Sequence, residues 1–208
     1  MFTGIVQTQA CVLSAQCENN LTKLKISLPI SYIEHLTIGA SVAVNGVCLT
    51  AVDFAEIDNN SAYISFDIID ETLRVTNLNQ IKQGDKLNVE RSLKIGDEIG
   101  GHIVSGHIHC QAQLIDIQKN AENCQLTLQC ADQWMKYILA KGFITINGTS
   151  LTVGAISGDT FNVHLIPETL KITNLGQLSL GDKLNIELDQ QTVTIVDTIE
   201  RMQLNNLN

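Results

Sequence analysis

The amino-acid sequence predicts an all-β protein: two similar antiparallel barrels in tandem, followed by a helix. The first observation is an internal repeat, because VNGVCLT, ETLRVTNL and GDKLNVE return in the same order as INGTSLT, ETLKITNL and GDKLNIE. Ordered matches at a period of about a hundred residues indicate two whole domains, since solenoid units run about 20–50 residues. The second observation is a series of short alternating stretches bounded by turn signals, which is typical of barrel strands.

The strands are expected where apolar and polar residues alternate. The apolar positions are Leu24, Ile26, Leu28, Ile64, Phe66 and Ile68 in the first half, and Leu126 and Leu128 in the second. Turn signals follow at Asn45-Gly46, Asp58-Asn59-Asn60, Gly84-Asp85, Asn147-Gly148, Ser157-Gly158-Asp159 and Gly181-Asp182. Short strands with such turns fit a small antiparallel barrel, which closes its own edges. Each half also has one short helical candidate before its Asn-Gly turn, at residues 31–36 and 131–139.

The glycine-rich stretch from Gly96 to Gly106 is the expected junction between the domains. We therefore predict a first barrel over residues 1–101 and a second over residues 102–198. The stretch does not match a dinucleotide-binding fingerprint, because GxGxxG is absent and no long helix follows.

An amphipathic helix is predicted at about residues 191–205, after the second barrel. Val193, Val196 and Ile199 fall on one helical face, with Ile195 and Met202 on its flank. The first repeat has no counterpart to this helix. We expect another subunit to cover it.

Composition argues against several classes of function. The net charge of −9 disfavours nucleic-acid binding, which needs a basic face. No apolar run reaches about 18 residues, and the start MFTGIVQTQ lacks the pattern of a secretory signal, so no membrane association is expected. The six cysteines form no CxxC pair, which favours free thiols in the reducing cytoplasm over disulfides or zinc.

The two halves share a scaffold but differ in their reactive side chains. The differing pairs are Cys48 and Ser150, Gly39 and Lys141, Ile5 and His107, and Ser92 and Asp189. The pair of Ile5 and His107 assumes that Thr3-Gly4 is aligned with Ser105-Gly106. The second half thus carries a hydroxyl, an ammonium, an imidazole and a carboxylate. Two pockets of one shape and unequal chemistry suit two related ligands, one activated and one only held.

Each of these features also has a structural interpretation. An Asn-Gly pair is first of all a hairpin turn, and Glu-Thr-Leu with Thr-Asn-Leu downstream fits a helix cap and turn. Cys48 can be a small core residue, Lys141 can end a helix, and Asp189 can solvate a strand end. A metal site is suggested by His102, His107, His109 and Cys110. His107 and His109 would share one strand face, but no third ligand has a recognisable spacing beside them, so we expect no metal there.

Five motifs stand in order over nearly the whole chain: MFTGIV, the paired NGxCLT and NGxSLT, GGHxxSGHI, MKYILxKGF and HLIPETL. Together they resemble the riboflavin synthase family of lumazine-binding-repeat proteins. The resemblance implies two six-stranded Greek-key barrels and a homotrimer joined by C-terminal helices. It implies a reaction site that combines the N-terminal barrel of one subunit with the C-terminal barrel of a neighbour.

The resemblance also implies the reaction, a transferase step of riboflavin biosynthesis that uses no cofactor. Two molecules of 6,7-dimethyl-8-ribityllumazine react, and one donates a four-carbon unit to the other. The products are riboflavin, the flavin precursor, and 5-amino-6-ribitylamino-uracil.

Ligand-contacting and reactive residues carry over from the family motifs. In the first barrel the contacts are Gly4, Ile5, Val6, Cys48, Leu49, Thr50, Asp67, Ile68, Ile69, Asp70, Glu71 and Thr72. In the second they are Gly106, His107, Ile108, Lys141, Ser150, Leu151, Thr152, His164, Leu165, Ile166, Pro167, Glu168 and Thr169. The reactive residues map onto Ser150, His107, Cys48, Lys141, Thr152 and Asp189, with Phe2 at the N-terminus. Some members carry aspartate at the position of Asn147, so an acid role there cannot apply to this chain.

The implied chemistry needs these residue types. The C7 methyl of the lumazine is acidic, and His107 is the natural base for its proton. Lys141 and Thr152 can stabilise the anion, and Ser150 or Cys48 can add to C7 of the second molecule or hydrogen-bond the adduct. The sequence leaves the assignment of each proton transfer open.

Two other classes of function are alternatives to an enzyme. A non-catalytic lumazine or flavin carrier shares the repeat but is expected to lose the ligand motifs of the second barrel. Here SLT at residues 150–152 and GHI at residues 106–108 are intact. A structural interaction barrel would not explain two retained polar motifs.

Overall fold

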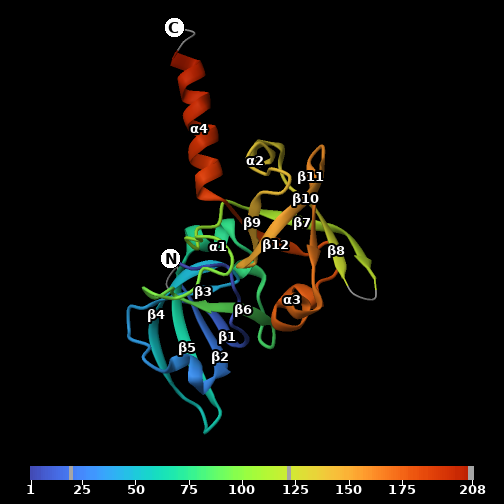
Figure 1. The fold of residues 1–208 in the computed structure, drawn as a ribbon. Coiled ribbons are helices and arrows are strands. Elements are labelled where there is room, and N and C mark those ends of the chain that lie inside the picture. Colours follow the sequence, from blue (N-terminus) through green and yellow to red (C-terminus); the bar gives the residue numbers. More distant parts are fainter. Residues whose placement is uncertain (19–20, 121–122, 206–208) are drawn as a thin grey trace.

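The computed structural model describes residues 1–18, 21–120 and 123–205, which form two closed six-stranded antiparallel barrels and a projecting C-terminal helix (Figure 1). Barrel 1 consists of β1 (Thr8–Glu18), β2 (Leu21–Pro29), β3 (Ser41–Val44), β4 (Val47–Glu56), β5 (Ser61–Ile69) and β6 (Lys86–Arg91). Barrel 2 consists of β7 (Cys110–Lys119), β8 (Cys124–Gln129), β9 (Phe143–Ile146), β10 (Thr149–Ser157), β11 (Thr160–Leu165) and β12 (Lys183–Leu188). The helices are η1 (Ile30–Ile33), α1 (Asp70–Val75), η2 (Asn77–Gln80), α2 (Asp132–Met135), α3 (Pro167–Ile172), η3 (Asn174–Gln177) and α4 (Gln190–Asn205).

The two barrels have the same topology, as the internal repeat predicts. Around barrel 1 the strand order is β1-β2-β5-β4-β3-β6, and barrel 2 repeats it as β7-β8-β11-β10-β9-β12. The pairings of β1 with β6 and β2 with β5 join strands distant in sequence, as in a Greek key. The predicted fold class is confirmed.

Each barrel has its own core, and the alternating residues build it. Leu24, Ile26, Ile64 and Phe66 are fully buried in barrel 1. Leu126 and its neighbours fill barrel 2 in the same way. Burying each such side chain contributes about 1.5–3 kcal/mol, so the period-two alternation favours a sheet that closes around these residues.

The Asn-Gly pairs form the hairpin turns between β3 and β4 and between β9 and β10. Asn45 and Gly46 have φ values of 46° and 80°, and Asn147 and Gly148 have the same values. The two turns also pack against each other, because a Cβ on Gly46 would lie 2.6 Å from the backbone nitrogen of Gly148. The turns are therefore both local hairpins and the contact between the barrels.

A network of buried asparagines surrounds this contact. Asn88 donates from Nδ2 to the carbonyl of Asn147 at 2.8 Å and accepts from the Asn174 backbone N–H at 2.7 Å. The equivalent Asn185 donates to the carbonyl of Asn45 at 2.9 Å and accepts from a backbone N–H at 2.7 Å. A groove of about 300 Å³ runs along this contact, and asparagines that bond to one another line part of it. The network fixes the two barrels relative to each other.

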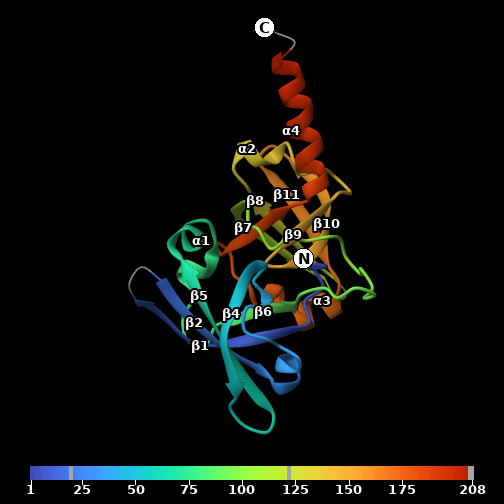
Figure 2. The ribbon, with the colours of Figure 1, turned by 90° about the vertical axis from the view of Figure 1, so that its left-hand side faces the viewer.

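Helix α4 leaves barrel 2 and extends away from both barrels (Figure 2). The Asp189 side chain caps its first turn by accepting from the backbone N–H and hydroxyl of Thr192, at 2.9 and 2.7 Å. One side of α4 lies on the α2 region, where Tyr137 donates to Asp197 at 2.6 Å. Exposed apolar residues cover more of the helix: Ile195 (59%), Ile199 (51%) and Met202 (60%).

The helices agree with the sequence patterns in part. The candidates at residues 31–36 and 131–139 are helical over shorter spans, η1 and α2. The Glu-Thr-Leu segments form α1 and α3, each followed by a 3-10 turn. Within the described ranges, no helix is long and apolar enough to cross a membrane.

Candidate active site

Two short segments cross between the barrels. Gly4 accepts a backbone hydrogen bond from Ser150 of barrel 2 at 2.7 Å, and Gly106 accepts one from Cys48 of barrel 1 at 2.9 Å. A Cβ on Gly4 would lie 2.6 Å from the Ser150 Cβ, and one on Gly106 would lie 2.5 Å from the Cys48 Cβ. The grouping of residues 4–6 with barrel 1 is therefore corrected: this segment flanks the site on barrel 2.

The same correction applies to residues 106–108, which flank the site on barrel 1. The alignment of Thr3-Gly4 with Ser105-Gly106 itself is correct, because the two segments make equivalent contacts. Sequence alignment shows that the two segments are equivalent, but it does not show which barrel each of them contacts. The path of the main chain between the barrels determines that contact.

Two buried glutamates hold the crossing segments. Glu90 accepts from the backbone N–H of Thr3 at 2.6 Å, from the Thr3 hydroxyl at 2.8 Å and from the Gly4 N–H at 3.1 Å. Glu187 makes the equivalent bonds to Ser105 and Gly106. Burial raises the pKa of both carboxyl groups, and these hydrogen bonds partly counteract the increase. Sequence reasoning missed both residues, although their identical place in GDKLNVE and GDKLNIE was a signal.

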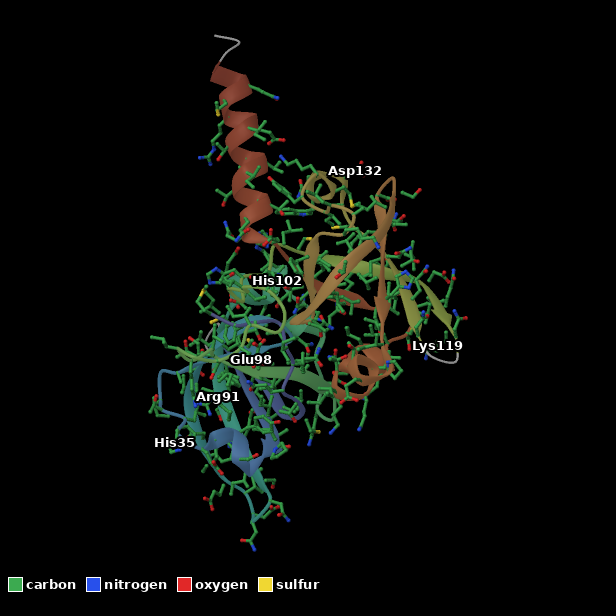
Figure 3. The ribbon with its side chains drawn as sticks, viewed as in Figure 1. His35, Arg91, Glu98, His102, Lys119 and Asp132 are labelled. Carbon is green, nitrogen blue, oxygen red and sulfur yellow. The ribbon has the colours of Figure 1, made fainter. Side chains whose placement is uncertain are left out.

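The Ser150 side chain is bonded to a histidine that the sequence analysis had considered only for a metal site. The Ser150 Oγ lies 2.7 Å from Nδ1 of His102, and the His102 Nε2 lies 3.3 Å from Oγ1 of Thr145. Figure 3 labels His102, which lies between the two barrels. The imidazole stacks on Phe143, with 4.9 Å between ring centroids and 15° between planes. Burial lowers the pKa of His102, and the charge of Asp189 opposes this shift.

Around Ser150, barrel 2 has an exposed surface that includes Lys141, Phe143 and Thr152, which we call the barrel 2 face or Ser150 face. Thr152 lies beside Phe143 across the β9–β10 ladder, and both are exposed. Lys141 has a φ of 67°, and the equivalent Gly39 has a φ of 87°. Lys141 donates its N–H to a carbonyl of β10, and Gly39 donates its N–H to a carbonyl of β4, both at 2.8 Å. A lysine in the left-handed region is unusual, and such outliers cluster at functional sites.

Cys48 occupies the equivalent face of barrel 1 with apolar neighbours. It lies opposite Ala43 in the β3–β4 ladder and packs against Phe2 and Val104. Phe2 is fully buried and pairs with Val104, so it anchors the N-terminal segment. Exposed His107 follows Gly106, and its N–H donates to the Ser105 hydroxyl at 3.3 Å. The structure thus brings His107 to the Cys48 face, not to the Ser150 face.

The remaining predicted contacts divide by burial. Exposed side chains on the two faces or at the starts of α1 and α3 are Ile5, Thr50, Asp67, Ile69, Asp70, Glu71, His164, Ile166, Pro167 and Glu168. Partly buried ones are Thr72, Ile108 and Thr169. Buried side chains, which leave only their backbone for a ligand, are Val6, Leu49, Ile68, Leu151 and Leu165.

Two predicted polar residues have structural partners. Glu71 pairs with Arg74 on the surface of α1 at 2.6 Å, and Asp189 caps α4. The histidines of the considered metal site point to different partners, since His109 accepts from the Leu188 N–H at 3.2 Å. Among the residues that the structure describes, no three His, Cys, Asp or Glu side chains are grouped to hold a metal ion.

Comparison with known proteins agrees with this duplicated arrangement. A family model described as "Lumazine binding domain" matches residues 3–92 and 105–189. The riboflavin synthase of Escherichia coli (strain K12) is 49% identical over 203 residues, which covers 97% of this chain and 93% of that protein. The riboflavin synthase of Chlamydia pneumoniae is 40% identical over 202 residues, covering 97% and 96%.

Solved structures of similar fold include two complexes of LumP. LumP complexed with 6,7-dimethyl-8-(1'-D-ribityl) lumazine has a TM-score of 0.80 at 25% identity, covering 91% of this chain and 100% of that one. LumP complexed with riboflavin has a TM-score of 0.81 at 28% identity, with the same coverage.

Proposed function

The chain belongs to the lumazine-binding family and acts as a transferase of riboflavin biosynthesis with riboflavin synthase activity, and we propose how its two barrels divide that reaction. Each barrel face holds one 6,7-dimethyl-8-ribityllumazine. A four-carbon unit passes from one molecule to the other, and riboflavin and 5-amino-6-ribitylamino-uracil are released. The observation that carries the proposal is the pair of equivalent faces with unequal chemistry, Ser150 on one and Cys48 on the other.

The roles that we propose for the residues follow from which barrel each crossing segment contacts. On the barrel 2 face, Lys141 and Thr152 stabilise negative charge on the lumazine, and Ser150 acts at C7. On the barrel 1 face, His107 is the base for a C7 methyl proton, with Cys48 beside it. Reactive groups therefore stand on both faces, and the faces must meet for the reaction. We keep residues 1–101 and 102–198 as the proposed domains.

We propose that the faces meet between subunits of a homotrimer. Ile5, Phe143 and Ile166 are 46%, 51% and 62% exposed, so the barrel 2 face is open and apolar enough to receive a second ring system. Stacking two lumazines in one orientation can supply about 7–11 kcal/mol of the barrier reduction. The exposed apolar side of α4 is the proposed trimer contact, and the six free thiols support a cytoplasmic location.

A lumazine or flavin carrier is the second candidate, because the LumP structures hold such ligands on the same fold. Against it, identity to the riboflavin synthases reaches 49%, compared with 25–28% to the LumP chains. The chain also retains Ser150, Lys141 and Thr152 on the barrel 2 face, which a carrier does not need.

The activity is tested with purified protein and 6,7-dimethyl-8-ribityllumazine in the presence of a chelator. We expect riboflavin and the pyrimidine in equal amounts, with no added metal, nucleotide or flavin. A folded protein that binds the lumazine but forms no riboflavin would support the carrier instead.

The subunit model is tested by light scattering on the intact protein and on a truncation after Gln190. We expect a trimer for the first and poorly active monomers that still bind ligand for the second. Ile199→Glu should weaken assembly, whereas Thr194→Glu, at an exposed position outside the apolar side of the helix, serves as the matched control. An active monomer of the intact chain would contradict a site shared between subunits.

A further inference from the structure

The polar chain around Ser150 has no equivalent around Cys48. Ser150 lies opposite Thr145 in the β9–β10 ladder, and His102 bridges the two hydroxyls at 2.7 and 3.3 Å. In barrel 1, Cys48 lies opposite Ala43, and both pack with apolar side chains. The repeats thus keep the same backbone here, and only the second one builds a hydrogen-bonded imidazole into it.

The surrounding structure contacts both the backbone and the ring of His102. Its backbone N–H donates to the Thr3 carbonyl at 3.1 Å, its ring stacks on Phe143, and its side chain is buried. Gly101 before it has no space for a side chain, since a Cβ there would lie 2.7 Å from the Ser150 Cβ. An imidazole held in this way can restrict the orientation of a hydroxyl that hydrogen-bonds to it.

The tautomer of His102 sets the orientation of the Ser150 hydroxyl. Burial lowers the pKa of His102, which favours the neutral ring with one N–H. The ring has a hydroxyl partner at each nitrogen, Ser150 at 2.7 Å from Nδ1 and Thr145 at 3.3 Å from Nε2, so a neutral ring donates to one and accepts from the other. In the tautomer with its hydrogen on Nε2, the ring donates to Thr145 and Nδ1 accepts from Ser150. With its proton turned to the ring, the Ser150 oxygen presents its lone pairs to a ligand on the open face.

We propose that His102 is a positioning residue, which holds the Ser150 hydroxyl in one rotamer with its oxygen lone pairs directed at the bound lumazine. This inference rests on the proposed function, in which Ser150 acts at C7. A free serine hydroxyl samples three staggered wells, and only one of them is productive. His102 acts through Ser150 and has no contact with substrate in this role.

Steady-state kinetics on the full-length protein test the coupling. His102→Gln should lower kcat by about 10–100-fold, with KM changed by less than about threefold, because ground-state binding depends on other contacts. His102→Asn should retain more activity, since its amide oxygen can take the place of Nδ1. His35→Asn, at an exposed position with a φ of 56°, is the matched control and should behave as the original protein.

The double variant distinguishes positioning from a general structural defect. In a Ser150→Ala background, His102→Gln should cause no further loss of kcat, because the group through which it acts is gone. Independent, multiplicative losses would overturn the inference, as would a His102→Gln enzyme with unchanged kcat. Thermal melts of each variant identify any that fail to fold, and Thr145→Val then provides a second, smaller perturbation of the same chain.

An NMR measurement separates this inference from the proposed function. In the ¹⁵N-labelled protein we expect a neutral His102 with its hydrogen on Nε2, and Ser150→Ala should shift the Nδ1 resonance. If the protein makes no riboflavin but shows this shift, the proposed function fails and the hydrogen-bonded arrangement stands. If it makes riboflavin and the Nδ1 resonance ignores Ser150→Ala, the positioning role fails.

Discussion

Gly101→Ala should damage the Ser150 site, because a side chain at this position has no room. A Cβ at Gly101 would overlap the Thr3 carbonyl oxygen and would lie 2.7 Å from the Ser150 Cβ and 2.9 Å from its Oγ. Two of these neighbours are atoms of a fixed strand or a bonded carbonyl, so they cannot rotate away. The added methyl group therefore has to move either the crossing N-terminal segment or β10.

The size of the effect follows from these contacts. Overpacking of this kind costs about 1–3 kcal/mol, and the weakening of the His102–Thr3 and Ser150–Gly4 backbone bonds adds about 0.5–1.5 kcal/mol each. The loss of glycine freedom in the unfolded chain offsets about 0.4–1 kcal/mol. The midpoints of these ranges give a net loss of about 3 kcal/mol, which corresponds to about 6–12 °C in Tm for a chain of this length. Displacing a reacting group by about 1 Å can cost about a hundredfold in rate.

Gly100→Ala is the matched control, since its Cβ would meet only the flexible Ile5 side chain, at 3.3 and 3.6 Å. Thermal melts and riboflavin formation, followed by absorbance, should show a near-normal Gly100→Ala protein and an impaired Gly101→Ala protein. Equal stability and equal rates for the two would refute the reasoning, because the segment would then have room to shift without disturbing Ser150.

Four further predictions concern the two halves. Ser150→Ala should lower kcat more than Cys48→Ala, with little effect of either on lumazine affinity by fluorescence titration; equal losses would show that the divergence is drift. Lys141→Gly should leave stability unchanged or raise it by up to about 1 kcal/mol, because it removes a left-handed lysine, while turnover falls at least tenfold. Asn88→Ala should cost about 2–4 kcal/mol in urea unfolding, since two partners across the barrel contact lose their bonds, whereas exposed Asn79→Ala should cost almost nothing. The isolated residues 1–101 should bind lumazine more weakly than the intact chain and make no riboflavin, because residues 106–108 beside Cys48 are missing; turnover by this fragment would contradict the need for both barrels.

The fold was predictable because its causes are local and repeated. Alternation at Leu24 and Ile26 sets which face of β2 is buried, and the Asn-Gly pairs set the hairpin register at β3–β4 and β9–β10. Each pattern occurs twice, so an error in one half would conflict with the other. Helix α4 occurs only once, but it was predictable because its apolar period is also a local pattern. Its exposed side does not identify a partner.

Candidate site residues could be proposed from the sequence, but which of them lie together could not. Ser150 and Cys48 stand out as a difference between matching segments. That Gly4 lies on Ser150, and Gly106 on Cys48, depends on two chain crossings between barrels, which no local pattern encodes. His102 was missed as a partner of Ser150 because it lies in a glycine-rich junction, where isolated histidines carry no periodicity.

The crossing changes what the duplication means for catalysis. If residues 4–6 and 106–108 each remained on their own barrel, the imidazole of His107 would join Ser150 and Lys141, and barrel 1 would only hold a ligand. Because each segment contacts the other barrel, His107 lies on the Cys48 face, and the imidazole that hydrogen-bonds to Ser150 is that of His102. Neither face alone then carries the base, the cation and the hydroxyl. In the reaction scheme that we propose, which needs all three groups, a barrel 1 face and a barrel 2 face meet over the two lumazines. The exposure of both faces is the reason that our proposal assigns this meeting to neighbouring subunits.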